Sequence, residues 1–214
     1  MTPPQIPSEF TVICPYMNTP IHTHEGETFI ASASSFYDIN DESPYKAFSS
    51  HETTDTPGSD TNQWTTGSPS YRSSFFTGTY ICCTTTVDQI EFKGEWLQLQ
   101  CTNSHVVQSF SIMANFGNPV RAPESFILVG SDDGIAWTLL HSEHNAGKWD
   151  SKQEKGFIPT IKKEAKFFRL IITGINGPNE WLTIDKFRLF ENTIKSPEVV
   201  TTHPLSGDGA SMCE

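Results

Sequence analysis

Two histidines and two glutamates lie close together near the start of the chain, in the run His22-Thr23-His24-Glu25-Gly26-Glu27. Imidazole nitrogens and carboxylate oxygens are common ligands of transition metals, so this run is a candidate metal site. The surrounding region is rich in proline, and alternating histidines in such a region are more often solvated polar residues. We favour this second interpretation.

The motifs of the common enzyme classes are absent from the sequence. It has no Gly-x-Ser-x-Gly, no P-loop, no Gly-x-Gly-x-x-Gly and no His-Glu-x-x-His. Residues 130–134 have the wrong spacing for a nucleophile elbow and are predicted to form a hairpin. Glu91 and Glu95 flank a predicted turn, so we expect surface carboxylates there, not the paired acids of a glycosidase. The sequence therefore predicts that the protein is not an enzyme.

The chain is acidic. Its 214 residues include 14 lysines and arginines against 25 aspartates and glutamates, which gives a formal net charge of −11. An acidic surface repels nucleic-acid phosphates and anionic lipids. No apolar stretch approaches the roughly 20 residues needed to span a bilayer. We therefore expect neither nucleic acid as a partner nor insertion into a membrane.

The five cysteines are an odd number and have no Cys-x-x-Cys spacing. They are Cys14, Cys82, Cys83, Cys101 and Cys213. We predict that these thiols are mostly free and buried, which is typical of synthesis in a reducing compartment. The first residues lack the basic and apolar regions of a signal peptide, and no Asn-x-Ser/Thr site is present. These features predict a protein made in the cytoplasm.

Three regions of different composition follow one another. Residues 1–27 contain five prolines, which disfavour regular helix, and are predicted to form an extended proline-rich arm. Residues 28–191 carry the apolar periodicity of a folded domain. Residues 192–214 are rich in Thr, Ser, Pro and Gly and are predicted to form a flexible C-terminal tail. Two arms on one domain suit a chain that binds neighbouring proteins in an assembly.

Apolar residues of the central region alternate with a period of two, which is typical of β-strands. Leu97, Leu99 and Cys101 share one face of a predicted strand. Residues 125–129 are apolar on both faces, as in a strand that is covered on both sides. No long segment has the periodicity of an amphipathic helix. Many short strands separated by turns predict an all-β sandwich or barrel.

Several segments resemble the discoidin domain, also called the coagulation factor 5/8 type C domain, in the order in which that family has them. The segments similar to its strands, short turn and loop tryptophan are residues 30–35, 43–48, 62–64, 94–99, 167–170 and 187–190. The most specific similarity is the strand and Ser-x-Asp-Gly hairpin of residues 125–137, where Asp133-Gly134 supplies the positive φ of a tight turn. The resemblance covers about residues 28–191. It implies an all-β, jelly-roll β-sandwich of the galactose-binding-like type with extended N- and C-terminal arms.

The resemblance also implies a place for a ligand. In sugar-binding relatives, an arginine in the middle of the domain and an aromatic residue shortly before the last strand hold the sugar. Arg121, which follows Asn115 and Asn118, and Trp181 occupy similar regions, so these four residues are the candidate ligand-binding site. The alternative is that Trp181 fills the core and Arg121 pairs with a nearby acid.

Members of this family often hold a structural calcium ion with an Asp after the short turn and a Glu at the end of the last strand. Ser49-Ser50 replaces the Asp-Gly of that site, whereas Asp60, Asn62 and Glu191 remain as oxygen donors. Calcium takes six to eight oxygen ligands, so the missing carboxylate matters. Because this carboxylate is missing, we favour no bound ion. The alternative, which the resemblance implies, is a structural calcium at these three residues, and no other cofactor is expected.

These observations favour a non-catalytic binding or assembly module. Our first hypothesis is a structural or attachment component on the surface of a virus particle or a similar large assembly. Such a protein would contact its neighbours through the terminal arms and would also bind glycans. The alternatives are a secreted or cell-surface lectin-like module that binds carbohydrate, and an intracellular scaffold of a cytoskeletal or ciliary assembly. The location predicted first is the particle surface, and the extracellular space is the alternative.

Overall fold

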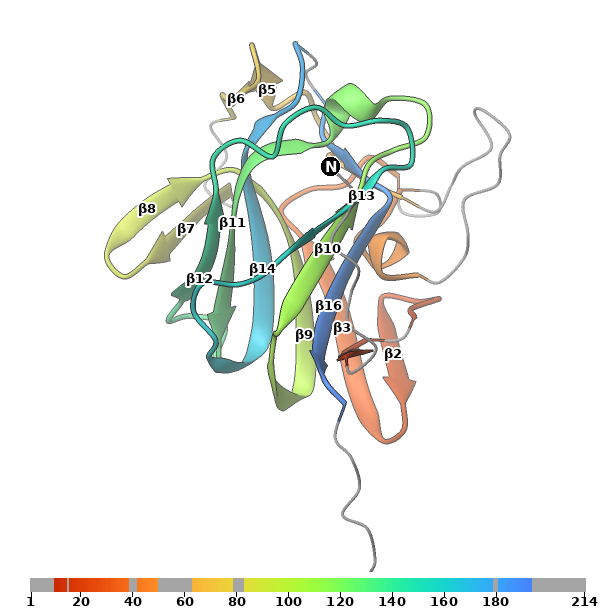
Figure 1. The fold of residues 1–214 in the computed structure, drawn as a ribbon, viewed down its shortest axis with the longest axis vertical. Helices are drawn as coiled ribbons and strands as arrows, with labels where there is room; N and C mark the ends of the chain where they lie inside the picture. The colour runs from red at the N-terminus through yellow and green to blue at the C-terminus, as the bar shows by residue number, and fades with distance from the viewer. Residues whose placement is uncertain are drawn as a thin grey trace, which may run out of the picture.

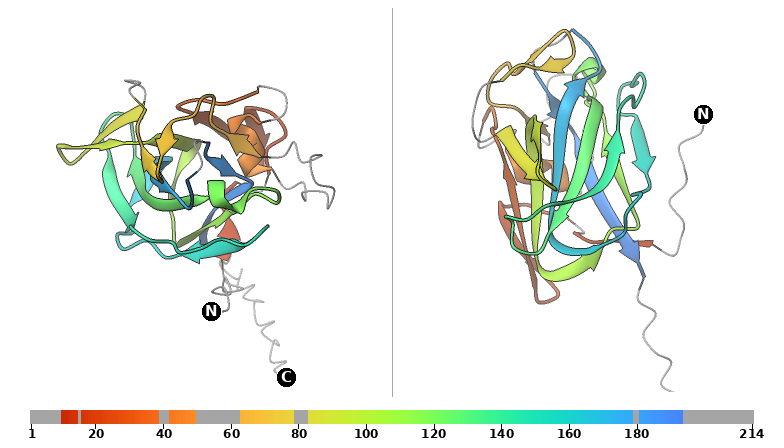
Figure 2. Two further views of the ribbon diagram at one scale, coloured as in Figure 1. Left: turned by 90° about the horizontal axis from the view of Figure 1, so that it is seen from above. Right: turned by 90° about the vertical axis from the view of Figure 1, so that its left-hand side faces the viewer.

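The computed structural model describes residues 10–14, 16–38, 42–49, 63–78, 83–178 and 181–193. These residues form two layers of antiparallel β-sheet that pack face to face, with two short 3-10 helices between strands (Figures 1 and 2). Within these ranges, no helix is both long enough and apolar enough to cross a membrane. The predicted all-β jelly-roll sandwich is confirmed.

The strands form two main sheets. The first sheet has the spatial order β1 (Phe10–Val12), β16 (Lys186–Asn192), β10 (Ser109–Met113) and β13 (Glu154–Phe157). The main path of the second sheet is β12 (Thr138–Glu143), β11 (Pro123–Ser131), β14 (Glu164–Ile175), β9 (Glu95–Val106), β3 (Glu27–Ala33) and β2 (Ile21–His24). In the same sheet, β6 (Phe75–Phe76) pairs with β14 and with β5 (Tyr71–Arg72).

Shorter elements close the ends and one outer face of the sandwich. They are β4 (Trp64–Thr65) paired with β15 (Thr183–Ile184), the hairpin β7 (Thr84–Val87) and β8 (Ile90–Lys93), and the helices η1 (Pro44–Phe48) and η3 (Pro119–Arg121). The turn expected at residues 43–48 is confirmed as η1. The three cysteines in the described ranges, Cys14, Cys83 and Cys101, are free and buried, as predicted.

Alternating residues of the central strands fill the space between the two sheets. Leu97, Leu99 and Cys101 of β9 are almost completely buried in the main core, which confirms their predicted common face. In β11, Phe126 and Leu128 point into the same core. A side-chain period of two places such residues on one face of a strand.

The opposite face of β11 is covered as well. Ile127 and Val129 pack in a second apolar cluster with Val87 from the β7–β8 hairpin, with Trp137 and with Ile171. The prediction that residues 125–129 form a strand covered on both sides is confirmed. The β7–β8 hairpin therefore acts as a third layer over the sheet.

The turn after β11 has the geometry that its sequence predicts. Gly134 has a φ of +74°, a conformation that side chains other than glycine's rarely adopt. The Ser131 hydroxyl accepts a hydrogen bond from the Gly134 N–H at 2.9 Å. The Asp133 carboxylate accepts hydrogen bonds from the N–H groups of Ile135 and Ala136 at 2.8 and 2.9 Å. The Ser-x-Asp-Gly run is thus a turn that satisfies its own backbone donors.

The described part of the N-terminal region belongs to the sandwich, so the prediction of an arm over residues 1–27 is corrected for residues 10–14 and 16–27. Strand β1 pairs with β16 in one sheet, and β2 pairs with β3 in the other. Ile13 and Met17, which lie between these strands, are buried. Burial of their apolar side chains favours packing of the segment against the sandwich. Pro20 precedes an edge strand, where a missing N–H costs no ladder hydrogen bond. Residues 1–9 and most of the predicted tail lie outside the described residues.

A histidine lies in the aromatic part of the core. The His141 ring on β12 is 5.3 Å from the Phe110 ring, 5.9 Å from the Phe157 ring and 6.3 Å from the Phe126 ring, measured between centroids. Among the described residues, neither ring nitrogen has a hydrogen-bond partner at normal geometry. Burial lowers the pKa of His141, and the charge of Glu143 and a weak contact with the Ile158 backbone offset this only in part.

Replacement of His141 by phenylalanine is expected to raise the free energy of unfolding by about 1 kcal/mol near neutral pH, because it removes two unpaired buried nitrogens. The gain should grow as the pH falls through about 6.5. Below that pH the unfolded wild-type histidine binds a proton that the folded state disfavours, so acid destabilises the wild type more than the variant. Urea unfolding at about pH 8 and about pH 5 measures the difference. A gain that shrinks toward acid pH would contradict the neutral, buried state of His141.

Candidate functional site

One end of the sandwich consists of loops and carries exposed aromatic side chains. The loop after β3, the loop that contains η3 and the turn before β15 meet there, at the top of Figure 1 and facing the viewer in the left view of Figure 2. Phe36, Tyr37 and Phe75 at this end are 41%, 63% and 71% exposed. We call this surface the loop end. Exposed aromatic groups of this kind are typical of binding surfaces.

Tyr37 and Trp181 form an aromatic pair at the loop end. Their ring centroids are 5.4 Å apart and their planes lie at 81°, an edge-to-face arrangement that aromatic rings favour. Tyr37 is largely exposed and Trp181 is half-buried. The second ring limits the movement of the first, so the pair presents an apolar surface of defined shape.

A buried carboxyl group anchors the loop that carries Tyr37. Glu95, the first residue of β9, is completely buried and accepts hydrogen bonds from the hydroxyls of Ser34, Ser35 and Ser70. The bonds from Ser35 and Ser70 are 2.9 and 2.7 Å long. The expectation that Glu95 is a surface carboxylate is therefore wrong. The serines that donate to Glu95 lie on two loops. The alternation of residues in β9 does not indicate that these loops contact Glu95.

Backbone contacts hold the same loop against its neighbours. The Trp64 indole N–H donates to the Ser35 carbonyl at 2.8 Å, and the Tyr37 N–H donates to the Thr65 carbonyl at 2.9 Å. Gly67 lies against Phe36, whose carbonyl oxygen is 2.7 Å from the point where a Cβ would be. Only glycine allows this approach without a shift of one backbone segment. Tyr37 is thus presented by a loop that is fixed at several points.

Asn115 is a structural residue of the loop end. It is buried, and its side-chain oxygen accepts hydrogen bonds from the N–H groups of Gly117 and Asn118 at 3.0 and 2.9 Å. Its NH₂ group donates to Asp185 at 2.9 Å and also to Gln63. These contacts use both ends of the amide, so Asn115 shapes the loop and does not offer a free group to a ligand. Asn118 is exposed at the start of η3.

Arg121 and Trp181 lie on neighbouring parts of the loop end. The turn at residues 176–178 contacts the η3 region, because the Asn176 N–H donates to the Ala122 carbonyl at 2.9 Å and Gly177 packs on Val120. Arg121 is half-buried, and its Nε has no hydrogen-bond partner among the described residues. Trp181 follows this turn and does not belong to the buried core. The roles of these residues in ligand binding stay predictions.

Sequence reasoning found Trp181 but missed Tyr37 and Phe36. Nothing in the local pattern of residues 34–38 marks them as exposed. What identifies Tyr37 as a site residue is its contact with Trp181, and these two residues are far apart in the sequence.

The structure describes only part of the predicted calcium site. Ser49, which stands at the position of the calcium-binding Asp, accepts a hydrogen bond at 3.1 Å from the ammonium group of Lys186, a buried residue. Glu191 lies at the opposite end of β16 and bonds to His105. Asp60 and Asn62 lie outside the described residues, so a calcium ion held by them stays a prediction.

His105 lies between two carboxylates at the end of the sandwich opposite the loop end. Its Nδ1 is 2.9 Å from Glu191 and its Nε2 is 2.8 Å from Glu27. Burial lowers the pKa of His105, but hydrogen bonds and charges from Glu27 and Glu191 raise it more, so the net pKa lies above its ordinary value. His24 and Glu25 line a pocket of about 450 Å³ at this cluster.

Comparisons with solved structures show which known fold this is. The chain is similar to the module CpGH89CBM32-5 from Clostridium perfringens, in complex with GalNAc-beta-1,3-galactose, at a TM-score of 0.50 and 16% identity over 75% of this chain and 94% of that one. The fold is the discoidin-like, galactose-binding-like sandwich. An F-lectin (fucolectin) from striped bass (Morone saxatilis) serum has it too, at a TM-score of 0.51 and 12% identity, over 76% of this chain and 46% of that one. No protein-family model and no curated protein sequence matches the chain.

Proposed function

We propose that this protein is a non-catalytic module that binds glycans at its loop end. The observation that carries the proposal is the Tyr37–Trp181 pair, which presents aromatic surface at the end of a rigid sandwich. A sugar ring has an apolar C–H face that packs on an aromatic ring and hydroxyls that need hydrogen-bond partners. The two similar structures, a carbohydrate-binding module and a lectin, agree with this choice of ligand.

Polar groups for the sugar hydroxyls lie on the η3 side of the same end. Asn118 is exposed, and Arg121 is half-buried, with its Nε buried and without a hydrogen-bond partner among the described residues. A guanidinium group offers several N–H donors in one plane, which suits neighbouring hydroxyls of a sugar. The proposed site therefore combines an aromatic platform with donors on an adjacent loop, while Asn115 keeps the loop in place.

A glycan array followed by affinity measurements tests the proposal. The array identifies a ligand, and binding of that ligand is then measured for Trp181→Ala and Tyr37→Ala. We expect each change to weaken binding by about tenfold or more, which corresponds to about 1.4 kcal/mol. Ile135→Ala is the matched control, because Ile135 is 81% exposed on the hairpin at the opposite end and should not affect affinity. An array without binding, or equal affinity in all variants, would count against the proposal.

We also propose a setting for this module, namely the surface of a virus particle or a similar large assembly. The acidic chain, with a net charge of −11, suits contacts with proteins or glycans more than with nucleic acid. Mass spectrometry of purified particles from the source of the protein is the direct test. We expect this chain among the surface components, and its absence from every particle preparation would contradict the setting while leaving glycan binding untouched.

A further inference from the structure

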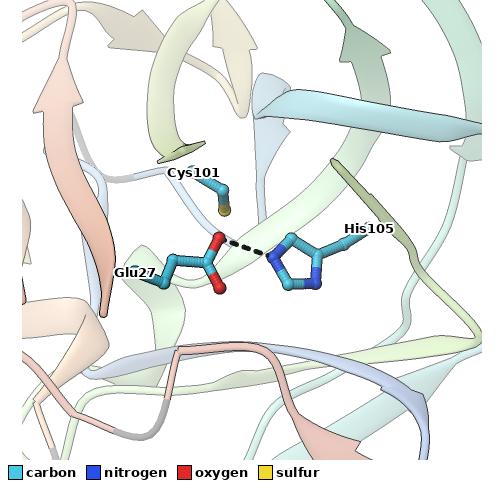
Figure 3. Close-up of side chains that lie close together, drawn as sticks. All are labelled: Glu27, Cys101 and His105. Atoms are coloured by element: carbon cyan, nitrogen blue, oxygen red, sulfur yellow. Dashed lines mark hydrogen bonds and ion pairs between the residues drawn. The ribbon is translucent and has the colours of Figure 1, made fainter. Parts of the chain in front are cut away.

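A cluster of three different metal-ligating side chains lies at the end of the sandwich opposite the loop end. Glu27 opens β3, and Cys101 and His105 lie on the neighbouring strand β9 (Figure 3). One ligand atom from each residue lies within 4.8 Å of the others. Cys101 is 2% exposed and the His105 side chain 9%. The three side chains converge from two hydrogen-bonded strands, whose positions the sheet fixes.

We propose that Glu27, Cys101 and His105 bind one zinc ion. An imidazole nitrogen, a thiolate and a carboxylate oxygen form a donor set that zinc accepts in tetrahedral geometry, with the fourth position open to water or another ligand. Calcium and magnesium prefer oxygen donors alone, so this mixed set discriminates against them. The proposal is independent of the glycan site, which lies at the other end of the sandwich.

The carboxylate of Glu191 supports this assignment. It lies 2.9 Å from Nδ1 of His105, on the side of the ring that faces away from Glu27. Metal-binding histidines usually donate their second N–H to a carboxylate or carbonyl, which orients the ring toward the ion. Glu191 is therefore a positioning residue, and His105 would present Nε2 to the metal.

Hydrogen bonds satisfy the ring of His105 without metal, because Nδ1 lies 2.9 Å from Glu191 and Nε2 lies 2.8 Å from Glu27. In the metal-bound cluster, zinc would replace the contact between Nε2 and Glu27, and Nδ1 would keep its contact with Glu191. Ligands bind zinc in their deprotonated forms, so the Cys101 thiol would lose its proton to solvent.

The adjacent pocket provides access to the fourth position. It has a volume of about 450 Å³ and is lined by polar groups that include Glu27, His105, Glu191 and His24. His24 and Glu25 belong to the histidine-rich run of the sequence. In the structure, that run borders the metal-ligating cluster. Among the residues described, Glu27 is the one residue of the run that belongs to the cluster.

Cobalt(II) is a suitable probe because it replaces zinc in such sites and shows a charge-transfer band when a thiolate binds it. The full-length chain is treated with a chelator, and cobalt and zinc are titrated separately. We expect a thiolate-to-cobalt band in the wild type that zinc abolishes. The band should be absent in Cys101→Ser and retained in Cys83→Ser, which changes another buried cysteine. Circular dichroism of each variant verifies folding.

Calorimetry measures zinc affinity and provides a second readout, which does not depend on the thiolate-to-cobalt band. We expect His105→Ala to weaken binding at least a hundredfold and Glu191→Gln to weaken it ten- to a hundredfold. Proton release on zinc binding should appear as a dependence of the binding enthalpy on the buffer. A missing thiolate band in the folded wild type, or a band that persists in folded Cys101→Ser, would overturn the proposal.

Discussion

Glu95→Ala is expected to lower the free energy of unfolding by about 3 kcal/mol, because three serine hydroxyls lose their common acceptor inside the protein. The deletion also leaves a cavity at a completely buried position. Ser34 and Ser35 begin the loop that carries Tyr37, so we also expect weaker glycan binding in the folded variant. Urea unfolding measures the first effect and titration with the array ligand measures the second.

Glu91→Ala is the matched control for this change. Glu91 lies on the β7–β8 hairpin four residues earlier and is exposed, so its removal should change stability by less than about 0.5 kcal/mol. Glu95→Gln keeps the shape and one acceptor oxygen, and should fall between wild type and Glu95→Ala. Equal stability of Glu95→Ala and Glu91→Ala would show that the serine contacts do not hold the loop.

Arg169→Ala is the second substitution with a large expected effect. The Arg169 guanidinium lies between the rings of Trp96 and Trp137, at 4.1 and 4.2 Å from their centroids. It also donates to Gln98 at 2.9 and 2.7 Å and to Thr85 at 3.0 Å. These contacts join the outer face of the larger sheet to the β7–β8 layer.

We expect Arg169→Ala to lower the free energy of unfolding by about 3 kcal/mol, since it removes two cation–π contacts and leaves the Gln98 oxygen without its donor. Burial lowers the pKa of Arg169 to about 10, so the group is charged at neutral pH. Arg169→Lys keeps the charge but cannot stack as a plane between two rings, so an intermediate loss is expected. Thermal unfolding monitored by tryptophan fluorescence reports both changes.

Arg188→Ala provides the comparison for Arg169. Arg188 forms a partly exposed ion pair with Glu154 at 2.9 Å, a kind of contact worth at most about 1 kcal/mol. If both alanine variants lose the same stability, the stacked arrangement of Arg169 contributes no more than an ordinary surface ion pair.

The strands of the sandwich could be predicted from sequence because their determinants are local. The alternation of Leu97, Leu99 and Cys101, and the two-sided apolar run of β11, indicate strands without knowledge of their partners. The role of β1 and β2 was missed, because edge strands of three and four residues carry little periodicity and depend on partners far along the chain.

The functional surfaces were harder to predict for the same reason. Trp181 followed from a family resemblance, but Tyr37, its partner, lies on another loop and has no local signature. Glu27 was noted as a neighbour of two histidines near it in the sequence. The structure instead places it beside Cys101 and His105, more than seventy residues away. Both the aromatic pair and the metal-ligating cluster depend on how distant strands and loops pair in the fold. One sequence does not determine this pairing.

The central claim is that glycans bind at the loop end, and backbone amide chemical-shift mapping by NMR tests it most directly. The array ligand is titrated into isotope-labelled protein. We expect the largest shift changes at Tyr37, at the amide and indole N–H of Trp181, and at Asn118, with little change around His105. Shift changes that concentrate around His105, or on the outer face near Arg169, would contradict the account.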